Sequence, residues 1–342
     1  MRTLTALSLL PLLIAAAAEQ QDSRSSGTDW KAWLESHTSG FSGVVVIGRD
    51  DEIEFEAAYG LADASTGRSN TPATRFNLGS INKTFTAVAI ARLIQEGRLS
   101  LDDTVSKLLP DYPNRAAASR ITIRDLITHR SGVAQFMRAD FGEASVAEMA
   151  QMVGAAPQAF EPGARQAYSN GGYVVLGRII EVASGRSYDD YVADHVYRPA
   201  GMTSTGFFGR GDSDDRIAVP VASGAQPEGP RRGNPAGGSY ATAADLFRFV
   251  RALRAGTLLD RRMTEYVVSG TFSEAQPWGF AMRQQTVGSA RFIGNGGGAP
   301  GVNAEFRFHA KGPETVVVLA NDGPPAATNL MTLILGRIAG RK

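Results

Sequence analysis

Residues 80–97 read SINKTFTAVAIARLIQEG, and the interpretation of the whole chain starts from them. The part from 85 to 94 is almost wholly apolar, which is typical of a helix buried on all sides, and Gly97 suits the end of such a helix. Ser80 and Lys83 stand at its start, and residues three apart lie on one face of a helix. We therefore expect a buried helix whose first turn directs a hydroxyl and an amine to a common point.

Ser80 and Lys83 have the chemistry of a nucleophile and its base. A serine hydroxyl is a weak nucleophile until a base takes its proton. A lysine can be that base only if burial or a nearby positive charge lowers its pKa from about 10.4, and the apolar helix supplies the burial. The helix N-terminus also offers the Ser80 N–H to a developing oxyanion. The alternative is an ordinary helix start with a capping serine and a solvated lysine, so the rest of the chain must decide.

A second motif, Tyr168-Ser169-Asn170, stands before an apolar helix predicted at 173–183. A phenol and an amide at this spacing can pass protons beside Ser80 and orient the lysine and the substrate. Another Tyr-x-Asn, at 112–114, contains a proline and is interpreted as a surface turn. The alternative for Tyr168 is a core aromatic at a helix entry.

A third motif is the glycine-rich box at 294–301, GNGGGAPG, beside a predicted strand. So many glycines are costly to order, and they are expected where the backbone must approach a ligand closely. We expect a backbone N–H of this box, that of Gly298, to be the second oxyanion donor. A merely flexible hairpin is the alternative.

The order of predicted elements indicates an α+β fold. Strand-like runs occur near both ends of the chain and helices lie between them, which favours one antiparallel sheet built from the N- and C-terminal strands. A mainly helical subdomain, roughly residues 84–235, is inserted in it and flanks it, and residues 209–238 form an irregular excursion. The predicted strands are at 41–47, 53–59, 290–294, 302–309 and 315–320, and the clearer helices at 29–37, 123–128, 146–153, 173–183, 242–254 and 326–338.

The first eighteen residues resemble a cleaved signal peptide. Arg2 gives a positive start, residues 4–14 are mostly apolar, and small residues follow at 15–18. The apolar run is too short to span a bilayer comfortably. We expect an exported protein, periplasmic or secreted and without a stable membrane anchor, in which residues 19–342 form a single catalytic domain.

Composition narrows the function. The formal net charge is +1 without a basic run, so nucleic acid is not expected as a partner. Cysteine is absent, which excludes thiol catalysis and disulfides. The sequence contains no Gly-x-Ser-x-Gly elbow and no His-x-x-x-His pair, so neither a Ser-His-Asp hydrolase nor a metal enzyme is favoured. We expect no cofactor, no metal and no obligate protein partner.

The three motifs together, Ser80-x-x-Lys83, Tyr168-x-Asn170 and the glycine-rich third box, resemble those of the serine β-lactamase and penicillin-binding superfamily. The likeness is greatest to its class C-like branch, which includes family VIII-type carboxylesterases and D-amino-acid peptidases. Residues 126–132 (LITHRSG), 199–202 (PAGM) and 235–242 (PAGGSYAT) are similar to structural signatures of that branch. The likeness covers roughly residues 38–340.

The resemblance implies a role for each of these residues. Ser80 would be the acylated nucleophile, and Lys83 and Tyr168 would share the general-acid and general-base work with coupled titrations. The substrate-binding and oxyanion residues would be Asn170, Asn295, Gly297 and Gly298, with the N–H groups of Ser80 and Gly298 forming the oxyanion hole.

One residue departs from the family pattern. Lactamase-type members carry a lysine and a hydroxyl in the third box, and many esterase-like relatives carry a histidine, whereas this chain has Asn295 followed by Gly296. Charge-assisted hydrogen bonds are roughly twice as strong as neutral ones, so recognition of a substrate carboxylate should be weaker unless Arg231 or Arg232 compensates. We therefore expect a serine hydrolase of small esters or amides, with carboxylesterase favoured. A class C-like β-lactamase, a D-amino-acid peptidase and a catalytically silent binding protein of the same fold are the alternatives.

Overall fold

The computed structural model describes residues 29–136, 141, 143–208, 214–221, 232–269 and 279–340. Contacts divide the chain into two units, residues 1–40 and residues 41–342. The described part of the first unit is a short helix at 29–35 and a turn, where the rings of Trp33 and His37 stack with centroids 4.1 Å apart. The predicted signal peptide, residues 1–18, lies outside the described residues. Within the described ranges, no helix combines the length and the apolar character needed to cross a membrane.

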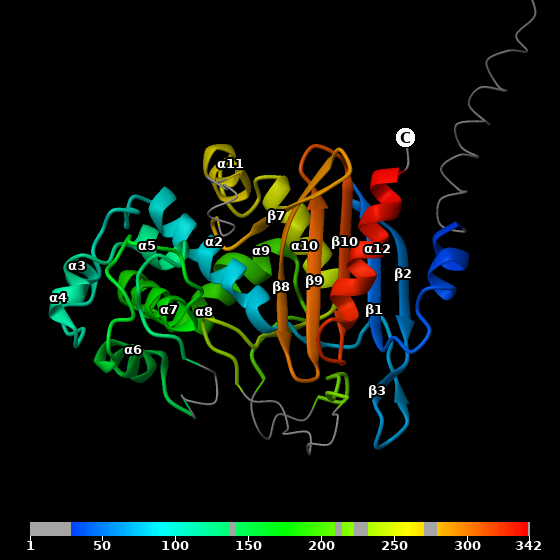
Figure 1. Cartoon of the computed structure of the whole chain (residues 1–342), viewed down its shortest axis with the longest axis horizontal. Coiled ribbons are helices and arrows are strands. Elements are labelled where there is room, and N and C mark those ends of the chain that lie inside the picture. Colours follow the sequence, from blue (N-terminus) through cyan, green and yellow to red (C-terminus); the bar gives the residue numbers. More distant parts are fainter. Residues whose placement is uncertain are drawn as a thin grey trace, which may run out of the picture. The chain divides into compact units, whose positions relative to one another are not determined.

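Six antiparallel strands form one sheet in the second unit, and they come from both ends of the chain, as predicted (Figure 1). The strand order is β2-β1-β10-β9-β8-β7. The first and last strands pair directly, with Val45 opposite Val318. The strands are β1 (Gly43–Arg49), β2 (Glu52–Tyr59), β7 (Arg283–Val287), β8 (Ala290–Ala299), β9 (Val302–His309) and β10 (Glu314–Ala320).

Helices cover both faces of this sheet. On β9, Phe306 packs edge-on against Phe249 of α10 (Ala243–Arg254), whereas its neighbour Glu305 accepts a hydrogen bond from Thr328 of α12 (Ala326–Gly340). Because successive strand residues point to opposite faces, α10 and α12 lie on opposite sides of the sheet (Figure 1). The central strands are therefore buried on both faces, which explains why β1 and β10 are apolar along most of their length.

The middle of the chain is mainly helical, and three of its helices begin and end within three residues of the predicted ones: α5 (Ile123–Ile127), α6 (Val146–Ala155) and α7 (Asn170–Ser184). Helix α2 (Asn82–Gln95) is deeply buried, from Asn82 through Ala91. It packs against α7, α8 (Tyr188–Val192) and α11 (Arg261–Ser269). The other helices among the described residues of this region are η1 (Gly79–Ile81), α3 (Val105–Leu108), α4 (Arg115–Ala118), η3 (Ala193–Tyr197) and α9 (Arg198–Ala200).

Two small two-stranded sheets complete the fold, and one of them leads directly to Ser80. It pairs β5 (Phe76–Asn77) with β6 (Tyr240–Ala241), and the next N–H, of Leu78, donates to the Ser239 carbonyl at 2.8 Å. The other pairs β3 (Leu61–Asp63) with β4 (Arg68–Ser69). The β5–β6 pair holds the segment after residue 234 beside the start of α2.

Candidate active site

Ser80 lies in η1, a single 3₁₀ turn that leads into α2. The prediction of a helix start at this serine is confirmed, although the α-helix proper begins at Asn82. Gly79 has a left-handed backbone (φ +49°), and its N–H donates to the Asn77 side chain at 2.9 Å. This turn redirects the chain from β5 into the core and leaves the Ser80 side chain half-buried.

Lys83 is the best-defined group of the site, because its side-chain nitrogen is enclosed and has three polar neighbours. Only 1% of the residue is exposed. Its Nζ lies 3.3 Å from Ser80 Oγ, 2.8 Å from Asn170 Oδ1 and 2.5 Å from the Ala236 carbonyl oxygen. Burial lowers the pKa of Lys83 well below its ordinary value.

The partners of Lys83 suit a neutral amine. The Asn170 side-chain oxygen and the Ala236 carbonyl can only accept hydrogen bonds. A neutral amine has two N–H groups and one lone pair, so when both N–H groups serve these acceptors the lone pair remains for the hydroxyl proton of Ser80. The arrangement is that of a base facing a nucleophile.

Tyr168 completes the cluster from the other side of Ser80. Its Oη lies 2.6 Å from Ser80 Oγ, and Lys83 Nζ lies 4.8 Å from the centre of its ring. Burial raises the pKa of Tyr168, opposed in part by the hydrogen bond with Ser80. The phenol is therefore protonated near neutral pH and can donate as well as accept.

A helix begins within the Tyr168-Ser169-Asn170 motif, and this explains how the spacing brings the phenol and the amide to the same cluster. Ser169 is the N-cap of α7, with its side chain accepting from the Gly172 N–H. Asn170 follows as the first helical residue, and its side chain is used twice: Oδ1 accepts from Lys83, and Nδ2 donates to the Phe136 carbonyl at 2.8 Å. Asn170 therefore orients the lysine in this structure.

The glycine-rich box, predicted to lie beside a strand, has its residues up to Ala299 within the strand β8 itself. β7 pairs with β8 only up to Gly294, so the following residues of β8 approach η1 on their free edge. A Cβ at Gly297 would lie 2.0 Å from the Leu78 carbonyl oxygen and 2.7 Å from the Ser80 nitrogen, and a Cβ at Gly79 would lie 3.1 Å from the Gly298 nitrogen. Only glycine permits this approach, which packs the backbone of Gly297 and Gly298 against Gly79 and Ser80 of η1.

Asn295 departs from the expectation that its side chain recognises substrate. It is 2% exposed, and its Nδ2 donates to Thr84 Oγ1 at 3.1 Å and to the Ser80 carbonyl at 3.5 Å. Its Oδ1 accepts from the Gly296 N–H at 2.9 Å. The short neutral side chain thus ties β8 to the first turn of α2 instead of extending toward a ligand.

Of the two arginines considered as substitutes for the missing cation, Arg231 lies outside the described residues. Arg232 forms an ion pair with Asp189, at the start of α8. The structure thus gives Arg232 a structural partner away from the Ser80 cluster.

Sequence reasoning missed the Ala236 carbonyl as a partner of Lys83. Residues 235–242 were noticed only as a motif, and the tight turn Asn234–Gly237 carries the carbonyl to the lysine. The Pro235 carbonyl accepts in addition from Thr86 of α2 at 2.7 Å. His129, which belongs to the motif at 126–132, packs against Tyr168 with ring centroids 4.7 Å apart. For Ala236 and for His129, the sequence motif that contains the residue was the signal that could have identified it.

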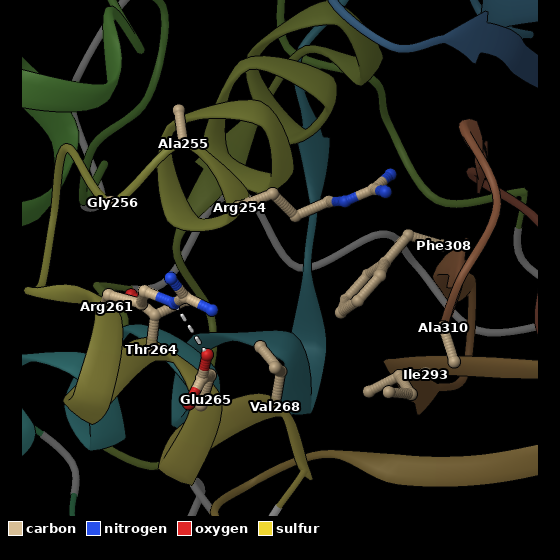
Figure 2. A pocket seen from close by; sticks show the side chains of 10 residues that line it. All are labelled: Arg254, Ala255, Gly256, Arg261, Thr264, Glu265, Val268, Ile293, Phe308 and Ala310. Carbon is tan, nitrogen blue, oxygen red and sulfur yellow. Dashed lines mark hydrogen bonds and ion pairs between the residues drawn. The ribbon is translucent and has the colours of Figure 1, made fainter.

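A separate cavity of about 410 Å³ opens between α10, α11 and the sheet (Figure 2). Its apolar wall includes Val268, Ile293 and Phe308, and the Arg261–Glu265 ion pair lies at another side. None of its lining residues belongs to the Ser80 cluster. Among the residues that the structure describes, no group of three or more His, Cys, Asp or Glu side chains could hold a metal ion.

Comparisons with known proteins agree with this geometry. Residues 29–340 match the family model described as Beta-lactamase. The esterase EstB of Burkholderia gladioli is 28% identical over 81% of this chain and 83% of its own length, and penicillin-binding protein 4 of Amycolatopsis lactamdurans is 28% identical over 90% and 87%. The crystal structure of a penicillin-binding protein from Bacillus halodurans superposes with a TM-score of 0.80, at 27% identity over 89% of this chain and 98% of that one.

Proposed function

This chain belongs to the β-lactamase family of serine hydrolases, and we propose that it is an exported carboxylesterase that hydrolyses small esters through an acyl-serine at Ser80. The observation that carries the proposal is that two proton-transfer groups meet at the hydroxyl oxygen of Ser80. Ser80 Oγ has the Tyr168 phenol at 2.6 Å and the buried amine of Lys83 at 3.3 Å.

Acylation starts when Ser80 Oγ attacks the ester carbonyl carbon. Lys83, acting with Tyr168, takes the hydroxyl proton, because a buried neutral amine is a competent base near neutral pH. The negative charge that develops on the carbonyl oxygen is held by the N–H groups of Ser80 and Gly298. Tyr168 then donates a proton to the departing alkoxide, and the alcohol leaves.

Deacylation repeats these steps with water in place of the alcohol. Water attacks the acyl carbonyl, its proton passes to the Tyr168 and Lys83 pair, and Ser80 Oγ departs and is reprotonated. Because the two bases share one proton path, their titrations are coupled. The same oxyanion donors serve both halves of the reaction.

Preference for neutral esters follows from the third box. Asn295 carries no charge, and its amide is used inside the protein by Thr84 and the Ser80 carbonyl. A substrate carboxylate would therefore find no cation from this position, and it would lose a charge-assisted hydrogen bond. The similarity to an esterase supports the same choice.

β-Lactam hydrolysis and cleavage of D-amino-acid amides are the second candidate. They use the same acyl-serine chemistry, and the similarity to penicillin-binding proteins favours them. A catalytically silent binding protein is a third, and the presence of Ser80, Lys83 and Tyr168 in bonding positions argues against it.

The test compares catalytic efficiency on two chromogenic substrates. We expect kcat/KM for short-chain nitrophenyl esters to exceed that for nitrocefin, and Ser80→Ala to lower both by about 10³-fold or more while the melting temperature is retained. An intact-mass increase on Ser80 should accompany ester turnover. Faster nitrocefin hydrolysis would transfer the assignment to the β-lactamases, and esterase activity retained in the Ser80→Ala variant would remove the mechanism.

Export is part of the proposal and has its own test. The apolar segment at 4–14 followed by small residues supports removal of roughly residues 1–18. The mass of the protein recovered from the periplasm or medium should lack this segment. A full-length protein confined to the cytoplasm would contradict export without affecting the catalytic assignment.

A further inference from the structure

His129 holds the polypeptide on both sides of Tyr168. Its carbonyl oxygen accepts from the Ala167 N–H at 2.8 Å, and its Nδ1 accepts from the Ser169 N–H at 3.2 Å. Its ring lies against the Tyr168 ring, with centroids 4.7 Å apart and planes inclined by 38°. One residue thus contacts three consecutive residues, of which the middle one carries the phenol that reaches Ser80.

The backbone of His129 is in an unfavourable conformation. Its φ is +58°, in the left-handed region that residues with a Cβ avoid. Such conformations persist where the surroundings enforce them, and they cluster at functional sites. Asparagine, aspartate and histidine are the residues other than glycine that occur there most often, and the contacts of His129 with residues 167–169 hold it in this conformation.

The ring is buried in a way that keeps it neutral. His129 is 2% exposed and also lies beside Tyr173, with ring centroids 5.2 Å apart. Burial, with a smaller contribution from Lys83, lowers the pKa of His129 to about 3. Nδ1 therefore keeps its lone pair across the neutral range and remains an acceptor for the Ser169 N–H.

We propose that His129 is a positioning residue for Tyr168. It fixes the phenol at hydrogen-bond distance from Ser80 through the ring contact, the Nδ1 acceptor for the Ser169 N–H and the carbonyl acceptor for the Ala167 N–H, and it thereby sets the rate of Ser80 acylation. The inference rests on the proposed role of Tyr168 as a proton carrier. The side chain of His129 provides the Nδ1 acceptor and the ring contact with Tyr168, and each of these can be removed separately.

Two variants separate these parts. His129→Phe keeps an aromatic ring and removes the acceptor, whereas His129→Asn keeps an acceptor near Nδ1, tolerates a positive φ and removes the ring. The readouts are the second-order rate constant for labelling of Ser80 by a fluorophosphonate and kcat/KM for nitrophenyl acetate. We expect each variant to lower the labelling rate constant and kcat/KM by about tenfold or more, since small displacements of catalytic groups are costly. The effect on kcat should be larger than the effect on KM.

The decisive control repeats both substitutions in a Tyr168→Phe background. If His129 acts through the phenol, its replacement should change the labelling rate there by less than about twofold, because interacting residues are non-additive. Equal losses in the two backgrounds would overturn the inference, as would wild-type rates in both variants. His129→Asn guards against loss of folding in His129→Phe, with melting curves for each variant. A wild-type protein inert to ester and probe would instead overturn the proposed function, and the inference with it.

Discussion

Lys83 is the residue whose state decides whether the site works. A lysine must lose its proton before it can act as a base, and burial lowers the pKa of Lys83 well below its ordinary value. Two acceptors, Asn170 Oδ1 and the Ala236 carbonyl, then fix the direction of its lone pair. The same amine in solvent would be protonated near neutral pH and inactive.

This predicts the pH dependence of catalysis. Because the neutral amine is the active form, kcat/KM should rise with pH through the pKa of Lys83 and then level off. The lowered pKa places this rise well below about pH 10.4. Steady-state kinetics on nitrophenyl acetate from about pH 5 to about pH 10 measure it. Lys83→Met should lose activity by about 10²- to 10⁴-fold at every pH. A wild-type profile still rising at the alkaline end would show a charged lysine.

Asn295 illustrates what a residue's identity alone does not reveal. The motif assigns Asn295 to the third box, but the direction of its side chain depends on Thr84, which is 211 positions away in the chain. The Ala236 carbonyl is likewise 153 positions from Lys83. By contrast, Ser80 with Lys83 and Tyr168 with Asn170 are pairs whose short spacing falls at a helix start, so their arrangement was predictable from local geometry.

The inward direction of Asn295 gives a prediction about stability. Asn295→Ala should lower the free energy of unfolding by about 1–3 kcal/mol, because the buried Thr84 hydroxyl and Ser80 carbonyl would lose the Asn295 amide as a partner. The ratio of ester to nitrocefin activity should stay unchanged. Thr84→Val removes the same hydrogen bond from the other side, and the double variant should cost less than the sum of the two in denaturant titrations. A changed substrate ratio at unchanged stability would mean that the amide faces the substrate.

At the scale of elements, the site is made where the free edge of β8 meets η1. The box is predicted to lie beside a strand, and most of it lies in the strand, because tertiary pairing with β9 overrides the low strand preference of glycine. The central strands were recognised from their apolar runs, since a sheet covered on both faces needs no alternation. The helix starts were recognisable from their caps, such as Thr242 before α10.

The close approach of β8 to η1 predicts the effect of adding one methyl group. In Gly297→Ala the new Cβ would lie 2.0 Å from the Leu78 carbonyl oxygen and must push β8 away from Ser80. We expect kcat/KM to fall by about 10²-fold, with slower fluorophosphonate labelling. Gly336→Ala is the matched control, since its Cβ would meet no atom within 4 Å on α12, and alanine should stabilise that helix by about 0.5–1 kcal/mol. Equal activity of the Gly297→Ala and Gly336→Ala variants would contradict the close contact between β8 and η1.

At the scale of the whole catalytic unit, groups from three distant parts of the chain meet at Ser80. η1 follows the N-terminal strands, Tyr168 precedes the central helix α7, and the glycine box belongs to the C-terminal hairpin. Within the sheet, the N-terminal strand β1 pairs directly with the C-terminal strand β10. No single segment can therefore keep the site after the others have separated, and catalysis depends on the unit as a whole.

This organisation predicts that activity and fold are lost together. In a denaturant titration, the midpoint for loss of nitrophenyl acetate hydrolysis should coincide with the midpoint for loss of far-UV circular dichroism, as expected for one cooperative transition. Phosphonylation of Ser80 by a fluorophosphonate, with loss of fluoride, joins η1 to the oxyanion donors of β8 and should raise the dichroism midpoint, whereas Ser80→Ala treated with the same probe should show no increase. If activity disappeared at clearly lower denaturant than the dichroism signal, the helical and sheet regions would be separating before either unfolds.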